Sequence, residues 1–232
     1  MATPPTRVSY VASVFDTTTT PKTVSVTVQT GDRVLVASLA ANGTGGATNT
    51  APTGGGETYT QLATLGVDTN NSRNIAWSMT ATSAQTFNIS AVRPLVNTST
   101  IWGVLAWVYR GSDGFGAVGA PAVGTTNSLA TFTTQAANSA VLAFSADWNA
   151  VDGTTRTRRT INASTGTEET YYRNSVEYTV YTQRYDDAGA AGSVSAGYSA
   201  PTGQKSAIIA VEIKGAAAGA AALPELVMPQ MR

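Results

Sequence analysis

The residues able to do acid–base chemistry in this chain are carboxylates, because its 232 residues include no histidine and no cysteine. Ser-His-Asp triads, Cys-His pairs and histidine-ligated metal sites are therefore excluded. Two carboxylates about 5–10 Å apart could hydrolyse a glycoside. The candidates are Asp147, Asp152, Glu168, Glu169, Glu177, Asp186 and Asp187. Most lie in polar segments rich in Gly and Thr, which offer no apolar setting to raise one pKa, so we expect no catalytic residue, no metal site and no cofactor.

Aromatic and arginine side chains between residues 148 and 173 form a second group, whose types suit a sugar. The candidate glycan contacts are Trp148, Arg156, Arg158, Tyr171 and Tyr172. Aromatic faces and planar guanidinium donors match the apolar side and the hydroxyl edge of a pyranose ring. The other interpretation is structural: Trp148 caps the core, and the arginines pair with Glu168 and Glu169 across a hairpin. Both interpretations stay open, and the structural one is the simpler.

The elements that must position these residues are β-strands, because apolar and polar residues alternate with period two. The predicted strands are 7–14, 23–29, 33–40, 58–65, 74–80, 86–91, 102–109, 129–133, 140–147, 176–184, 193–198 and 207–213. WGVLAWVYRG, from Trp102, is apolar on both faces and predicts a strand covered on both sides. Residues 41–57 predict a glycine-rich loop, and 147–172 a second long loop or a loose hairpin. We predict an all-β fold, an antiparallel two-sheet sandwich of jelly-roll type.

Charge and hydropathy exclude two classes of partner. The chain has 14 basic and 14 acidic residues, so no basic field attracts nucleic acid. The longest strongly apolar run, 101–109, is far shorter than the roughly 18–20 residues that cross a bilayer, so we expect no membrane span. Charged residues make up only 12% of the chain, and such a surface suits a protein held in an assembly or exposed outside a cell.

The last residues predict a tether with an apolar end. We expect a β-sandwich domain over residues 1–214, then an extended tail of residues 215–232, in which a run of Ala and Gly precedes LPELVMPQMR. The predicted docking residues are Leu223, Pro224, Leu226, Val227 and Met228. Burying the four apolar side chains of Leu223, Leu226, Val227 and Met228 would contribute roughly 6–12 kcal/mol to binding. Ordering the segment costs a similar amount, at about 1–2 kcal/mol per residue. One tail should bind weakly, so an oligomer or lattice is favoured; a frayed terminus is the alternative.

Several segments carry a resemblance to a known family. TPKTVSVTVQTGDRVLVASLA, IAWSMTATSAQTFNIS, WGVLAWVYRGSDGF, SLATFTTQAANSAVLAFSADW and SAIIAVEIKG resemble, in that order, β-sandwich proteins encoded in the tail regions of bacteriophages that infect actinobacteria. The resemblance covers residues 7–215 and rests on strand pattern. It implies a jelly-roll-like sandwich located in the virion, a minor tail or decoration protein with a structural or adhesive role and no catalytic residues.

Two functions follow as expectations. The first is a structural virion protein whose tail docks on neighbouring virion subunits, with a homo-oligomer, a trimer or larger, as the expected state. The alternative is a glycan-binding adhesion module that recognises the host cell envelope through the segment from Trp148 to Arg173.

Overall fold

The computed structural model describes residues 3–17, 20–44, 46–66, 71–96, 100–119, 128–147, 156–174, 178–200, 202–203 and 206–217. These residues form strands and no helix, so the all-β prediction is confirmed. In the part of the chain that is described, no helix is long and apolar enough to cross a membrane. Trp148 and the docking residues Leu223, Pro224, Leu226, Val227 and Met228 lie outside the described residues.

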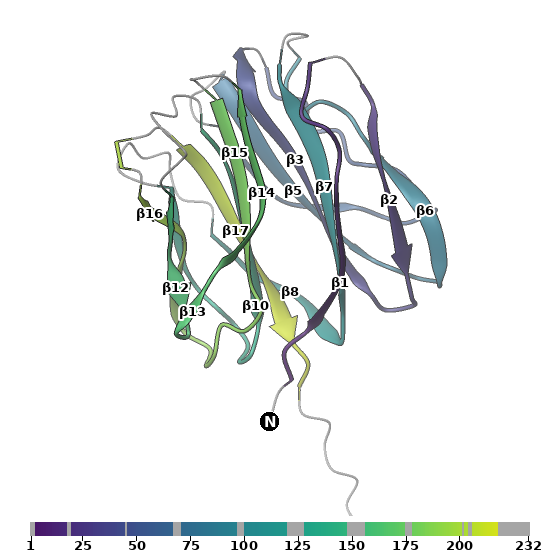
Figure 1. Cartoon of the computed structure of the whole chain (residues 1–232). Coiled ribbons are helices and arrows are strands. Elements are labelled where there is room, and N and C mark those ends of the chain that lie inside the picture. The colour runs from purple at the N-terminus through teal and green to yellow at the C-terminus, as the bar shows by residue number, and fades with distance from the viewer. Residues whose placement is uncertain are drawn as a thin grey trace, which may run out of the picture.

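Two five-stranded antiparallel sheets pack face to face at the centre (Figure 1). The first contains, in spatial order, β1 (Thr6–Ala12), β7 (Trp102–Arg110), β3 (Arg33–Thr44), β5 (Asn71–Thr80) and β4 (Thr60–Leu65). The second contains β14 (Thr167–Asn174), β15 (Tyr178–Tyr185), β10 (Ala140–Asp147), β17 (Ser206–Gly215) and β8 (Ser112–Gly119). Side chains from both sheets, among them Leu35, Trp107, Phe144 and Ile209, fill the space between them. The predicted antiparallel sandwich is therefore confirmed.

A smaller sheet covers each outer face of this sandwich. β2 (Lys22–Val28) pairs with β6 (Gln85–Ala91) and buries valines against the first central sheet. The second central sheet is covered by β9 (Leu129–Thr133), β16 (Ser193–Ala200) and β11 (Thr157–Arg158), with the hairpin β12 (Thr160–Ile161) and β13 (Ser164–Thr165) nearby. The body thus has four layers. This explains why β7 is apolar on both faces: its alternate side chains enter two different cores.

The two halves of the chain build the same unit. Strands β1 to β7 form the first central sheet with its cover, and strands β8 to β17 form the second. The two central sheets have the same strand order. The order β1-β7-β3-β5-β4 in the first sheet corresponds, strand by strand, to the order β8-β17-β10-β15-β14 in the second. The covering pair β2–β6 likewise corresponds to β9–β16, so only β11, β12 and β13 have no strand counterpart.

The register of the strands also assigns to individual residues of the first half their equivalents in the second half. Leu35 lies opposite Trp107 and Ser78, while Leu142 lies opposite Val211 and Arg184. Both edge strands also carry a bulge at the matching place, at Leu62 in β4 and at Glu169 in β14. The chain therefore contains two copies of a seven-stranded unit, a repeat longer than the 20–50 residues typical of solenoid proteins.

Five strands were not predicted from the sequence. β11, β12, β13 and most of β14 lie in the segment 147–172, where a long loop or a loose hairpin was expected, and no strand was predicted over β8. Close packing requires a glycine at one position of β8, because a Cβ on Gly116 would lie 2.2 Å from Oε2 of Glu212. The buried carboxylate therefore explains why one residue of β8 lacks the side chain by which a strand could have been recognised.

Candidate functional site

Arg156 and Tyr171, two of the predicted glycan contacts, lie together at the edge of the second central sheet. The Arg156 guanidinium lies 3.6 Å from the centroid of the Tyr171 ring, a cation–π contact. It also donates two hydrogen bonds to Glu168, from Nε to Oε2 at 2.7 Å and from an Nη atom to Oε1 at 2.5 Å. The side chains of Arg156 and Glu168 are each 19% exposed, so this pair is reachable from solvent but fixed in place.

Tyr198 completes the cluster from the covering sheet. Its hydroxyl donates to Oε2 of Glu168 at 2.8 Å, and its ring packs edge-on against Tyr181 with centroids 4.6 Å apart. Burial acts to raise the pKa of Glu168, but the hydrogen bonds from Arg156 and Tyr198 outweigh it and leave the pKa below its usual value. Burial, and then the hydrogen bond to Glu168, raise the pKa of Tyr198. The pairing of Arg156 with Glu168 is the one that the structural interpretation predicted.

Tyr172 does not join this group. Because side chains alternate along a strand, Tyr172 points to the opposite side of β14 from Tyr171 and stacks on Phe15 between the central sheets, with centroids 5.4 Å apart. Arg158 is exposed in β11, where it lies opposite Tyr198 of β16. The structure therefore brings together Arg156 and Tyr171, leaves Arg158 exposed on β11, and sends Tyr172 inward.

A shallow pocket lies beside Arg158, which we call the arginine pocket. Its lining residues are Arg158, Arg159, Thr160, Ser195 and Ser199, and its volume is about 250 Å³. Ser195 and Ser199 come from β16, and sequence reasoning did not find them because nothing local indicates that β11 pairs with β16. Neither arginine forms an ion pair within the described part of the chain, so the pocket carries positive charge.

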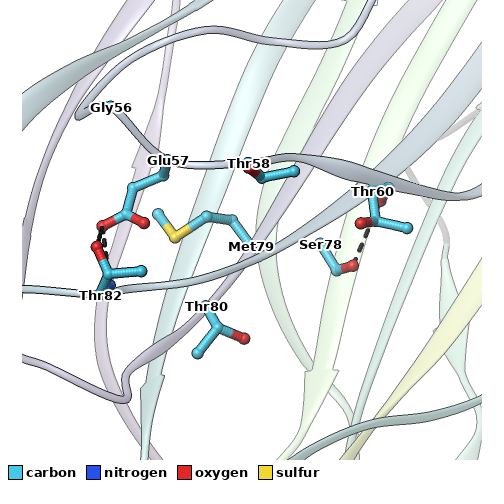
Figure 2. A pocket seen from close by; sticks show the side chains of 8 residues that line it. All are labelled: Gly56, Glu57, Thr58, Thr60, Ser78, Met79, Thr80 and Thr82. Atoms are coloured by element: carbon cyan, nitrogen blue, oxygen red, sulfur yellow. Dashed lines mark hydrogen bonds between the residues drawn. The ribbon is translucent and has the colours of Figure 1, made fainter.

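A second pocket, of about 280 Å³, lies in the first half between the glycine-rich segment and β5. Figure 2 shows Glu57 next to Thr82 at one end and Ser78 next to Thr60 at the other. Oε1 of Glu57 accepts hydrogen bonds from N and Oγ1 of Thr82 at 2.9 and 3.1 Å. Glu57 is the only carboxylate among the described residues that line this pocket, so the pocket does not supply the two carboxylates of a glycosidase.

Glu168 and Glu169, adjacent members of the predicted carboxylate set, face opposite sides of β14. Glu168 faces the covering sheet, whereas Glu169 lies between the two halves with a side chain that is 4% exposed. Glu169 accepts hydrogen bonds from Arg7 and Arg184 and from the Trp107 indole N–H. Within the described ranges, no three acidic residues come together in a way that could hold a metal ion.

No protein-family model, no curated protein and no solved structure matches this chain.

Proposed function

We propose that this protein is a structural component of a bacteriophage particle, a minor tail or decoration protein, whose C-terminal tail docks on neighbouring virion subunits. The observation that supports it most directly is the anchoring of the chain where the tail begins. Thr3 and Ala216 exchange two backbone hydrogen bonds, at 3.1 and 3.0 Å, and the N–H of Ala217 donates to Asp113 at 2.6 Å. The tail therefore starts from a fixed point at the end of the body where β1 begins and β17 ends (Figure 1).

The surface of the body supports the same proposal. On the outer face of the β2–β6 sheet the exposed side chains are uncharged: Thr23, Ser25, Thr27, Thr86 and Asn88. Thr131 and Ser195 form the matching hydroxyl pair on the other outer face, at 2.9 Å. The uncharged β2–β6 face can meet another protein surface without the cost of removing water from charges, which fits a protein that is covered by neighbours in an assembly.

The fixed start of the tail also favours an assembly with several copies of this protein. A single tail binds weakly because the burial of its apolar side chains and the ordering of its backbone nearly cancel. Several tails that start from bodies held in a homo-oligomer, a trimer or larger, act at a high effective concentration and bind firmly. The partners in this proposal are other virion proteins.

Removal of residues 218–232 tests this proposal. We expect the shortened protein to unfold at the same denaturant concentration as the full chain, because it keeps the anchoring bonds of Ala216 and Ala217. We also expect it to be absent from purified particles, as measured by quantitative mass spectrometry. A full-length control with Pro229→Ala should be incorporated normally, because that change spares the five docking residues. Normal incorporation of the shortened protein would contradict the proposal.

Recognition of a glycan on the host envelope is the second candidate, and the observation that favours it is the contact of the Arg156 guanidinium with the Tyr171 ring, with the exposed Arg158 two residues further along the chain. Replacing both Trp148 and Tyr171 by Ala should reduce adsorption of the protein to host cells by at least tenfold, measured by pull-down with labelled protein. Tyr171→Phe keeps the ring under Arg156 and should adsorb normally. Unchanged adsorption of the double variant would dismiss this function.

A further inference from the structure

The arginine pocket differs from its counterpart in the first half of the chain. In both halves the segment before the edge strand pairs with the second covering strand: Thr53 bridges to Ser90 of β6, and Thr157 lies opposite Ala200 of β16. In the first half this segment continues as three glycines, packed so closely on β6 that a Cβ on Gly54 would lie 2.2 Å from the Asn88 carbonyl oxygen. In the second half it carries Arg156, Arg158 and Arg159.

The comparison shows that the fold does not need arginine at this place. The first half builds the same pairing with an uncharged, glycine-rich segment. Arg156 has a structural partner in Glu168, whereas Arg158 and Arg159 have no carboxylate partner among the described residues. Nε of Arg159 is buried without a hydrogen-bond partner there, although a buried donor ordinarily finds one. An anionic ligand would pair with the two guanidinium groups that have no carboxylate partner in the described part of the chain.

The shape and chemistry of the pocket define the class of ligand. A guanidinium presents a planar set of donors that matches the oxygens of a phosphate or a carboxylate, and the hydroxyls of Thr160, Ser195 and Ser199 add further donors. The volume of about 250 Å³ is below that of pockets for drug-sized ligands. One anionic group therefore fits better than a whole oligosaccharide.

We propose that the arginine pocket binds an oxyanion, a phosphate or carboxylate group, and that this group is carried by an acidic polysaccharide. The second part rests on the glycan-binding function proposed above, and the first part does not. Arg158 and Arg159 supply the charge, and the hydroxyls of β16 set the orientation of the bound group. Because Arg158 is exposed, affinity decreases as the salt concentration rises.

The experiment titrates the full chain with inorganic phosphate at low ionic strength and follows backbone amide resonances. We expect saturable shifts at Arg158, Arg159 and Ser195, and at least a tenfold loss of affinity in the double variant Arg158→Gln, Arg159→Gln. Arg33→Gln is the matched control, because it removes a partly exposed arginine from the first half and should bind phosphate normally. Equal affinities in the double variant and the control, or no saturable shift at all, would overturn the oxyanion site.

A second arm separates the two parts of the proposal. The full chain and the double variant are applied to a phosphate-bearing wall polysaccharide, to a neutral polysaccharide and to single-stranded DNA. Retention on the acidic polysaccharide alone, lost in the double variant, supports both parts. Phosphate binding without retention on any polysaccharide, or with retention on DNA, keeps the pocket but contradicts the glycan function. Equal retention on neutral and acidic polysaccharides by both proteins keeps the glycan function and overturns the second part of the proposal, that the bound oxyanion is carried by an acidic polysaccharide.

Discussion

Glu212→Gln is expected to lower the free energy of unfolding by about 2–4 kcal/mol, because the amide places donors against donors. The Glu212 side chain is fully buried and its carboxylate accepts from three backbone N–H groups, those of Ala117, Gln135 and Ala136, at 2.8–2.9 Å. It also accepts from Oγ of Ser139 at 2.7 Å. These bonds tie β8 and the turn between β9 and β10 to β17, so their loss loosens three elements together.

Glu57→Gln is the matched control for this measurement. Glu57 accepts its three hydrogen bonds at one oxygen, Oε1, which the amide oxygen of glutamine can replace. We expect this control to change the free energy of unfolding by less than about 0.5 kcal/mol, determined by guanidinium chloride denaturation of both variants. If Glu212→Gln were as stable as Glu57→Gln, the carboxylate would not be the element that holds the β9–β10 turn.

Glu169→Leu is expected to cost about 2–4 kcal/mol, because a buried charge network loses the partner that its cations share. Leu62 is the equivalent residue of the first half, so leucine fits the bulge. The loss comes instead from Arg7 and the Trp107 indole, which would lose their shared acceptor, and from Arg184, which would keep only its ion pair with Asp186. Denaturant unfolding measures the effect directly.

A double variant separates lost pairing from poor packing. Adding Arg184→Ser recreates the Leu and Ser combination that the first half has at Leu62 and Ser78. Because the buried guanidinium is then gone, the double variant should recover part of the stability lost in Glu169→Leu. No recovery would mean that the leucine itself is badly packed and that the ion pair between Glu169 and Arg184, at 2.7 Å, contributes little.

The sequence was sufficient for the strands whose side chains alternate or are apolar on both faces. Every predicted strand segment overlaps an observed strand, and the two-sided apolar pattern of 102–109 correctly indicated a strand covered on both sides. The covering sheets could not be predicted, because β2 pairs with β6 and β16 with β9 across long stretches of chain. Local patterns carry no information on such distant partners.

The internal repeat cannot be recognised from the amino-acid sequence, for a physical reason. Equivalent positions keep their place in the sheet but not their chemistry: Val108 corresponds to Glu212, and Trp77 to Gln183. Each substitution is compensated by new partners in three dimensions, as the donors around Glu212 show. The strand register therefore shows that the two halves are alike, although the residues at equivalent positions differ.

The candidate site was predicted in part. Residue types alone grouped Arg156 with Tyr171, which the structure places in contact, and indicated the pairing of Arg156 with Glu168. They also included Tyr172, because the prediction of a loop over 147–172 hid the alternation of a strand that sends neighbouring side chains to opposite faces. The serines of the arginine pocket depend on the pairing of β11 with β16, which only the fold provides.

The joining of two like units in one chain has a consequence for stoichiometry. Arg110 ends the first unit and Ser112 begins the second, with only Gly111 between them. The covalent link therefore keeps the two units at a high effective concentration relative to each other. A ring of three chains would display six similar units and offer a sixfold-symmetric neighbour six similar contacts. Since the two units differ in exposed charged residues such as Arg158, the same ring would keep threefold symmetry at every contact that involves those residues.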